Sequence, residues 1–98
     1  MLNILVLCLN GELARHEYLE LVDQLRENNI KYRQNFNQLV LTTENTRTKF
    51  ISNKKHAIGL RPIPDIVCGF NNHISDELNL PSVSNHSPIF YIKQKEID

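Results

Sequence analysis

The hydrophobic pattern of the chain changes its period near residue 10. Residues 4–9 form an unbroken apolar run, which is typical of a strand buried on both faces in a parallel sheet. From Glu12 to Asn28 the apolar residues recur at spacings of mainly three and four, which predicts an amphipathic helix. The predicted buried face consists of Ala14, Tyr18, Leu21, Val22 and Leu25. A buried strand followed by such a helix indicates an α/β domain.

The ends of this predicted helix carry suitable capping residues. Asn10 can accept a hydrogen bond from a free N–H group of the first turn, and Gly11 permits a tight turn from strand to helix. Glu12 places a negative charge at the positive end of the helix. Asn28-Asn29 ends the helix, because asparagine tolerates the left-handed conformation that closes helices.

A β-rich section follows the helix. Lys31–Arg33, Leu39–Thr43 and Thr46–Ser52 have the alternation and composition of strands, with turns predicted at Asn35–Asn37 and Glu44-Asn45. We expect two or three antiparallel strands here, which would extend the edge of a mixed sheet.

The last third of the chain contains one clear strand pattern and several weaker ones. Asp65–Phe70 predicts a second buried strand, and Ile74–Leu78 a short helix. Asn79–Pro88 contains two prolines and is predicted to be a loop. Ile89–Ile92 predicts a final strand, and Lys93–Asp98 a polar tail.

These elements predict a single small α/β domain over residues 1–98. The expected architecture is a mixed sheet of about five strands in β-α-β-β-β order, with one main amphipathic helix. One helix cannot cover both faces of such a sheet, so one face should be incompletely covered. A partner protein or a second copy could close that face, which favours complex formation or homo-oligomerisation.

Composition is ordinary for a folded domain, with 41% hydrophobic and 22% charged residues. No apolar run approaches the roughly 18 residues of a membrane span, so we expect a cytoplasmic protein without a membrane partner. Cys8 and Cys68 lie in separate apolar runs and form no CxxC pair. We interpret both as buried, reduced thiols that pack as small hydrophobic side chains.

Net charge is zero, but the charge is unevenly distributed. Residues 1–30 carry a net charge of −3, residues 31–61 carry +6, and residues 62–98 carry −3. The basic residues of the middle segment are Lys31, Arg33, Arg47, Lys49, Lys54, Lys55 and Arg61. Such asymmetry indicates either a face for nucleic acid or an acidic partner, or intramolecular pairing with the acidic helix.

The basic segment is also interleaved with aromatic residues. Tyr32 and Phe50 could stack on bases while the cations contact the phosphate backbone. The zero net charge argues against a dedicated nucleic-acid binder. Nucleic-acid binding through residues 31–61 therefore remains an alternative hypothesis.

The other polar clusters give weaker signals. Glu12 and His16 are four residues apart and should interact on the helix surface rather than hold a metal ion. His73, Asp76 and Glu77 form a short polar cluster, for which we also expect no metal. No serine, histidine and aspartate arrangement matches a catalytic motif.

Three stretches resemble part of the ATPase core of helicases and phage terminases. NILVLCLNGELARHEYLELVDQLRENNI (3–30) is similar to the strand, loop and helix that follow the P-loop helix. LVLTTENTRTKFIS (39–52) resembles the strand pair before the Walker B strand, and GLRPIPDIVCGF (59–70) resembles the segment that contains that strand. The resemblance covers about residues 2–70 and implies a degenerate P-loop NTPase-like fragment of the kind found in small phage proteins.

The chain departs from this family at both catalytic elements. It has no GxxxxGK[ST] motif to hold nucleotide phosphates. The position of the Walker B acidic pair is occupied by Gly69-Phe70, which cannot organise Mg²⁺ or water. We therefore expect no enzyme activity, no catalytic, cofactor-binding or metal-binding residues, and no cofactor.

The leading hypothesis is a small phage-type protein that acts by protein–protein interaction, for example on a nucleic-acid-processing enzyme. The alternative is a nucleic-acid-binding accessory protein that uses residues 31–61. A nucleotide-binding remnant of the ATPase core is the third hypothesis.

Overall fold

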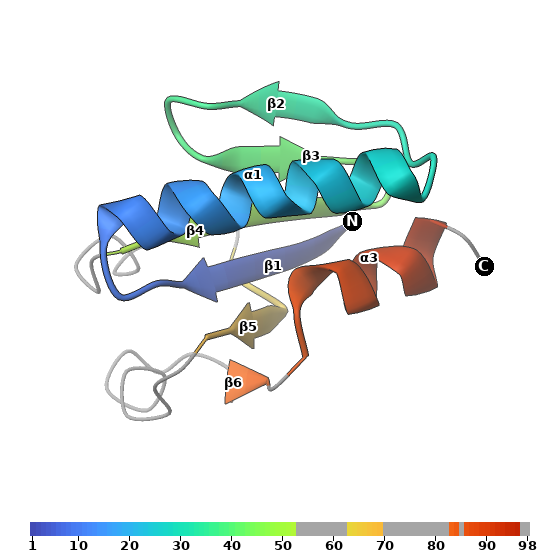
Figure 1. The fold of residues 1–98 in the computed structure, drawn as a ribbon. Coiled ribbons are helices and arrows are strands. Elements are labelled where there is room, and N and C mark those ends of the chain that lie inside the picture. The colour runs from blue at the N-terminus through green and yellow to red at the C-terminus, as the bar shows by residue number, and fades with distance from the viewer. Residues whose placement is uncertain (53–62, 70–82, 85, 97–98) are drawn as a thin grey trace.

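A computed structural model describes residues 1–52, 63–69, 83–84 and 86–96 of the chain. They form a six-stranded mixed sheet with two helices (Figure 1). The elements in chain order are β1 (Leu2–Leu7), α1 (Gly11–Glu27), β2 (Arg33–Asn35), β3 (Val40–Thr42), β4 (Thr46–Ile51), β5 (Ile66–Cys68), β6 (Val83–Ser84) and α3 (Pro88–Glu96). The predicted small α/β domain is confirmed, with six strands where about five were expected.

Strand β1 lies at the centre of the sheet, whose strand order is β2-β3-β4-β1-β5-β6. It pairs in parallel with β4 on one side and with β5 on the other, so that Ile4 is flanked by Thr48 and Ile66. A central parallel strand is covered on both faces, which explains why residues 4–7 are all buried.

Helix α1 closely follows the prediction from its sequence. The Asn10 side chain accepts a hydrogen bond from the Leu13 N–H at 2.9 Å, and Asn28 forms the C-terminal cap. Asn29 then adopts a left-handed conformation with φ of 55°. The buried residues of the helix are the five predicted ones, Ala14, Tyr18, Leu21, Val22 and Leu25.

Strands β2, β3 and β4 form an antiparallel set at one end of the sheet. The predicted strands 39–43 and 46–52 correspond to β3 and β4, and the bend at Glu44-Asn45 is confirmed. The first strand lies two residues later than predicted, at Arg33–Asn35 instead of Lys31–Arg33. Asn35 ends β2, and its side chain accepts a hydrogen bond from the Gln38 N–H at 3.2 Å, so the turn follows Asn35.

The prediction of a final strand at Ile89–Ile92 is wrong, because these residues lie in α3. Pro88 opens the helix, where its missing N–H is no loss, and lysines in the last turn favour the negative end of the helix dipole. Its buried residues, Pro88 and Ile92, are one helical turn apart. Helix α3 also includes the first four residues of the predicted polar tail. Neither described helix has the length and hydropathy needed to cross a membrane.

The predicted loop at Asn79–Pro88 is also only partly correct. Val83–Ser84 forms β6, which pairs in parallel with β5 at the edge of the described sheet. Pro88 belongs to α3. The predicted helix at Ile74–Leu78 lies outside the described residues.

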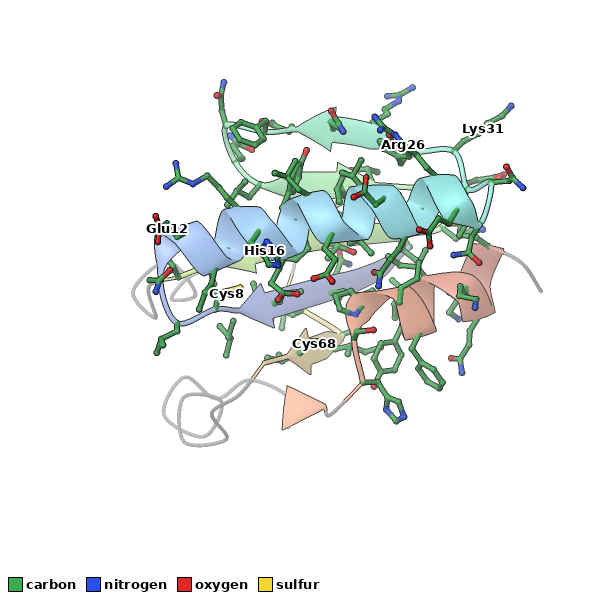
Figure 2. The ribbon with its side chains drawn as sticks, in the orientation of Figure 1. Cys8, Glu12, His16, Arg26, Lys31 and Cys68 are labelled. Carbon is green, nitrogen blue, oxygen red and sulfur yellow. The ribbon has the colours of Figure 1, made fainter. Side chains whose placement is uncertain are left out.

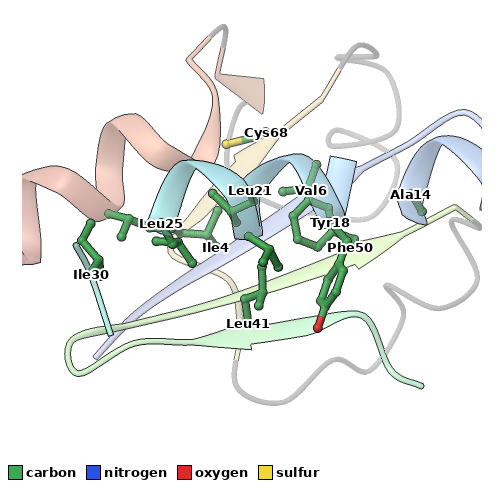
Figure 3. Close-up of a cluster of buried hydrophobic side chains, with 12 residues drawn as sticks. Ile4, Val6, Ala14, Tyr18, Leu21, Leu25, Ile30, Leu41, Phe50 and Cys68 are labelled. Carbon is green, nitrogen blue, oxygen red and sulfur yellow. The ribbon is translucent and has the colours of Figure 1, made fainter. Parts of the chain in front are cut away.

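Both described helices lie on the same face of the sheet (Figure 1). The hydrophobic core on that side joins α1 and α3 to the inward-facing side chains of four strands (Figure 3). Its buried members are Ile4, Val6, Ala14, Tyr18, Leu21, Val22, Leu25, Ile30, Leu41, Phe50, Cys68 and Ile92. Tyr18 lies edge-on against Phe36 and Phe50, with ring centroids 5.7 and 5.9 Å apart.

The other face of the sheet carries a second set of buried apolar side chains. They alternate along the strands with the helix-facing residues: Leu5, Leu7, Val40, Ile51 and Val67. Leu5 is 1% exposed and Val67 0% exposed. Both described helices lie opposite to this face, yet the single chain shields its centre from solvent. Burial of the central strands therefore does not require a second copy.

Candidate binding surface

A row of polar side chains crosses the sheet on the face opposite to the two described helices. Arg33 pairs with Thr42, and Thr42 pairs with Arg47 on the next strand. Residues at paired positions share one face of a sheet, and adjacent strands are about 4.8 Å apart. The two arginines therefore leave the sheet from positions roughly 10 Å apart, with the threonine between them.

Lys49 lies in the next row on the same side, where it pairs with Val40 and Leu5. We call Arg33, Arg47 and Lys49 the basic platform. Arg33 is exposed, whereas Arg47 and Lys49 are half-buried. Half-burial is typical of long basic side chains whose methylene groups cover apolar neighbours while the charge reaches water. All three residues of the platform belong to strands, Arg33 to β2 and Arg47 and Lys49 to β4, so the sheet fixes their positions.

Lys31 lies beside the platform, just before β2, and its side chain is exposed. It borders an open cavity of about 410 Å³, whose lining residues are Met1, Lys31, Tyr32, Arg33, Thr42, Thr43 and Glu44. The structure thus brings four of the seven predicted basic residues to one end of the sheet. Lys54, Lys55 and Arg61 lie outside the described residues.

The two aromatic residues predicted to accompany the cations do not lie on the platform. Phe50 is buried in the core beneath α1. Tyr32 is half-buried, and its hydroxyl accepts a hydrogen bond of 2.8 Å from Nε of Arg26 on α1. Both side chains therefore belong to the helix side of the sheet. The prediction of a stacking surface is wrong for Phe50, because its ring is buried in the core. Tyr32 borders the cavity beside Lys31 and Arg33, and its hydroxyl is bonded to α1.

The outer surface of α1 carries the opposite charge. Its exposed acidic residues are Glu12, Glu17, Glu20, Asp23 and Glu27. The exposed cations Arg15 and Arg26 only partly offset them, and Figure 2 shows Glu12 and Arg26 at opposite ends of this helix. The sheet therefore separates an acidic helical layer from the basic platform.

A second cavity, of about 420 Å³, opens at the carboxyl ends of β1 and β5. Its lining residues are Val6, Leu7, Cys8, Leu9, Leu13, Glu17, Cys68, Gly69, His86, Ser87 and Pro88. In the strand order, β1 is followed along the chain by the strands on one side of it and β5 by β6 on the other side, so the cavity lies at a switch point, where open α/β sheets commonly bind ligands. The position of the cavity is therefore suitable for a ligand site. Two of its lining residues are the cysteines Cys8 and Cys68, labelled in Figure 2, whose reactivity is considered next.

Both thiols in this cavity are poor nucleophiles at neutral pH. Burial raises the pKa of Cys8 to about 11, with a further contribution from the charge of Glu17. Burial alone raises the pKa of Cys68 to about 11. Because Cys68 pairs with Val6, Cys8 is offset from it by two residues, too far for a disulfide without backbone movement. Both cysteines are free, as predicted, although Cys8 is only half-buried.

Gly69 occupies the position that the ATPase resemblance assigns to the Walker B acidic pair. A Cβ atom added here would lie 3.0 Å from both Cβ and the carbonyl oxygen of Leu7. The missing side chain therefore allows close approach to β1. Gly69 contributes close packing at the base of the cavity and no ligand for a metal ion, while Phe70 lies outside the described residues.

The histidines do not form a metal site in the described ranges. His16 lies 3.8 Å from the carboxylate of Glu20 and not beside Glu12, so the predicted surface interaction involves the other neighbouring turn. His86 stacks on Phe90 with ring centroids 4.2 Å apart. Residues 1–52, 63–69 and 86–96 contain no group of three His, Cys, Asp or Glu side chains able to hold a metal ion. The predicted polar cluster of His73, Asp76 and Glu77 lies outside these ranges, as does the fourth histidine of the chain, His56.

Two features near the platform were missed from the sequence. Thr42 lies between the two arginines, and Glu96 of α3 accepts hydrogen bonds from the Thr43 hydroxyl and, at 2.6 Å, from the Asn45 N–H. The position of Thr42 could have been found by counting the alternation of β3. The Glu96 contact spans about fifty residues and leaves no local signal.

Comparison of the chain with protein-family models, curated proteins and solved structures finds no match. The functional argument therefore depends on the geometry and charge of the described surfaces.

Proposed function

We propose that this chain is a non-enzymatic binding protein that engages another protein through the basic platform. The observation that carries the proposal is the separation of charge between two layers. Arg33, Arg47 and Lys49 lie on the face opposite to the two described helices, whereas the acidic residues lie on α1. Complementary potentials steer encounter and fix the orientation of two proteins. The partner that fits this platform presents an acidic surface.

The resemblance to helicase and terminase cores suggests which class of partner to examine first. Phage-type proteins of this size would meet nucleic-acid-processing enzymes in the host cytoplasm. A protein partner is favoured over single-stranded nucleic acid because the platform lacks the stacking residues that single strands use. Tyr32 and Phe50 are on the helix side, and Phe50 is buried.

The test is affinity capture from a bacterial lysate by the wild-type chain and by the double variant Arg33→Glu/Arg47→Glu. The matched control is Lys93→Glu/Lys95→Glu, which makes the same change in net charge on exposed lysines of α3. We expect a dominant protein that survives nuclease, is retained by the control variant and falls at least tenfold with the platform variant. Equal capture by both variants, or no captured protein, would contradict the proposal.

Nucleic acid is the second candidate, and the row Arg33, Thr42, Arg47 is the observation that favours it. Two guanidinium groups and a hydroxyl are suitable donors to successive phosphate oxygens. We would measure binding to a labelled oligonucleotide of ~20 nucleotides at several salt concentrations. Binding that weakens with salt and with Arg33→Glu/Arg47→Glu, but not with the α3 control, would support it. Captured proteins that vanish with nuclease would favour this candidate over the protein partner.

A further inference from the structure

The backbone N–H and carbonyl groups along β2 point alternately toward β3 and toward the outer edge of the sheet. Thr43 donates its N–H to Thr46, and Leu39 accepts from the Phe50 N–H, so the odd-numbered residues of β3 hydrogen-bond to β4. Val40 and Thr42 therefore hydrogen-bond in the other direction, toward β2, where their partners are Asn35 and Arg33. It follows that the N–H and carbonyl groups of Gln34 point away from β3, to the outer side of the described sheet.

We propose that two copies of the chain pair through their β2 edges, antiparallel, about a two-fold axis at Gln34. Each Gln34 would exchange two backbone hydrogen bonds with Gln34 of the partner subunit. The dimer would contain one continuous sheet of two joined six-stranded halves. Strand β2 is the last strand at its end of the sheet, and no described element covers its outer edge in Figure 1. The described part of the chain therefore leaves this edge accessible.

The side chains of this edge are complementary to themselves in that register. Tyr32, the residue before β2, would lie near Phe36 of the partner subunit, the first residue of the turn after β2, and this aromatic contact would occur twice about the axis. Phe36 is 52% exposed in the single chain, and all three residues of β2 are exposed. Aromatic cross-strand pairs are among the more stabilising pairs in antiparallel sheets. Pairing thus covers a large side chain that one copy leaves in water.

The positive charge of Arg33 also favours a two-fold axis at Gln34. Arg33 lies opposite Asn35 of the partner subunit, so no two like charges face each other across the axis. A two-fold axis centred on Arg33 would instead place two guanidinium groups directly opposite, which is unfavourable. A three-residue edge buries little surface, so we expect a concentration-dependent dimer with a dissociation constant on the order of 100 μM.

The pairing would extend the basic platform. Because residues opposite each other share a face, the faces that carry the platforms of both copies lie on the same side of the joined sheet. Arg33 of each copy would then stand close to the axis, and the two platforms would form one continuous surface. The pairing itself does not depend on the proposed function, since it is argued from the edge of β2 alone.

A cysteine cross-linking experiment tests the register. Gln34→Cys places two thiols directly opposite across the axis, within reach of a short bis-maleimide. Glu20→Cys, on the exposed outer face of α1, is the matched control, and the wild-type chain measures any background from Cys8 and Cys68. We expect the Gln34→Cys variant to give at least fivefold more cross-linked dimer than Glu20→Cys. Equal yields would overturn the proposed register.

Two further variants test whether the edge itself is responsible. Gln34→Pro removes the outward N–H at a place where an edge strand tolerates proline, and Phe36→Lys adds a charge to the aromatic pair. By light scattering, we expect the wild-type chain to dimerise with increasing concentration and both variants to remain monomeric. Circular dichroism establishes that each variant is folded, and Phe36→Lys carries the test if Gln34→Pro is not. A wild-type chain that is monomeric up to ~1 mM would refute the proposal.

Discussion

At the residue scale, Thr46 and Thr48 provide a matched pair on one strand. Both are 0% exposed and both lie on the helix side of β4. The Thr46 hydroxyl lies 2.5 Å from that of Thr43, whereas the Thr48 hydroxyl has no hydrogen-bond partner among the described residues. A buried hydroxyl without a partner costs free energy that a methyl group of the same shape would not.

The two threonines should therefore respond oppositely to valine. We expect Thr48→Val to raise the free energy of unfolding by about 1 kcal/mol and Thr46→Val to lower it by about the same amount. Urea denaturation of both variants checks this difference. Since valine has a similar shape and strand propensity at both sites, the comparison isolates the hydrogen bond. A similar shift for both variants would mean that the Thr46–Thr43 contact contributes nothing.

The buried thiol of Cys68 predicts a dependence of stability on pH. Burial raises its pKa from an ordinary value of 9.0 to about 11. Below pH 9 the thiol is protonated in both the folded and the unfolded chain. Between pH 9 and 11 the unfolded chain releases the proton while the folded chain retains it, so the folded state loses stability as pH rises. We expect the free energy of unfolding of Cys68→Ala to fall less steeply than that of the wild-type chain over this window.

The measurement is a series of urea titrations from pH 8 to 11. Other groups also titrate in this window, and they include Tyr18, whose pKa is raised by burial and by Tyr32. The informative quantity is therefore the difference in slope between the two chains. Parallel curves would show that the Cys68 thiol titrates at the same pH in both states.

At the element scale, α1 and α3 show what local sequence can predict. Helix α1 carries five apolar residues at helical spacing and a polar cap at each end, so its bounds and buried face followed from the pattern. Helix α3 has nine residues, of which only Pro88 and Ile92 are buried, and its run of four apolar residues also suits a strand. Contact with the core of α1 decides between the two, and that contact is not local.

The candidate surface likewise has some features that local sequence predicts and others that it does not. The basic composition of residues 31–61 was evident from the sequence, and the alternation along β4 is sufficient to place Arg47 and Lys49 on one side. The same alternation places Phe50 on the opposite face from Lys49, so its burial in the core could also have been predicted. The start of β2 was predicted two residues too early, which changes its pairing but not the face of its side chains. The cap formed by Asn35 on the following turn determines where that strand ends.

The end of α3 is attached to the turn between β3 and β4 through Glu96. Its carboxylate accepts hydrogen bonds from the Thr43 hydroxyl and from the Asn45 N–H. Hydrogen bonds to a charged group typically contribute about 1.5–3 kcal/mol when well shielded, and this site is only partly buried. We expect Glu96→Ala to lower the free energy of unfolding by about 1–2 kcal/mol.

The control for this prediction is Gln94→Ala, an exposed position of the same helix. It should change the free energy of unfolding by less than about 0.5 kcal/mol. Hydrogen exchange gives a second readout, since release of Glu96 should increase exchange of the Asn45 N–H. Equal stability of the two alanine variants would show that the attachment of α3 to the turn is unimportant.

At the scale of the whole molecule, the sheet organises both burial and charge. Its helix side buries the main core, and its other side combines buried apolar residues at the centre with the basic platform toward β2. Self-pairing at β2 would use the edge and leave both faces in place. The proposed partner surface and the proposed dimer are thus compatible in one molecule.

This arrangement predicts that folding does not require the dimer. Leu5 and Val67, on the face opposite to the two described helices, are already buried in the single chain. An obligate dimer becomes more stable as protein concentration rises, because association is linked to folding. We expect the Tm of this chain to change by less than about 1 °C over a hundredfold range below the dissociation constant of the dimer.

Differential scanning fluorimetry at several concentrations checks this expectation, with Phe36→Lys as the monomeric reference. The wild-type chain and the variant should each give a constant Tm at low concentration, with any difference reflecting the lost Phe36–Tyr18 contact. A wild-type Tm that rises steadily with concentration, while that of the variant does not, would mean that the edge pairing is part of the folded state. In that case the exposed β2 edge would be an obligate interface, and the single chain would be only half of the stable unit.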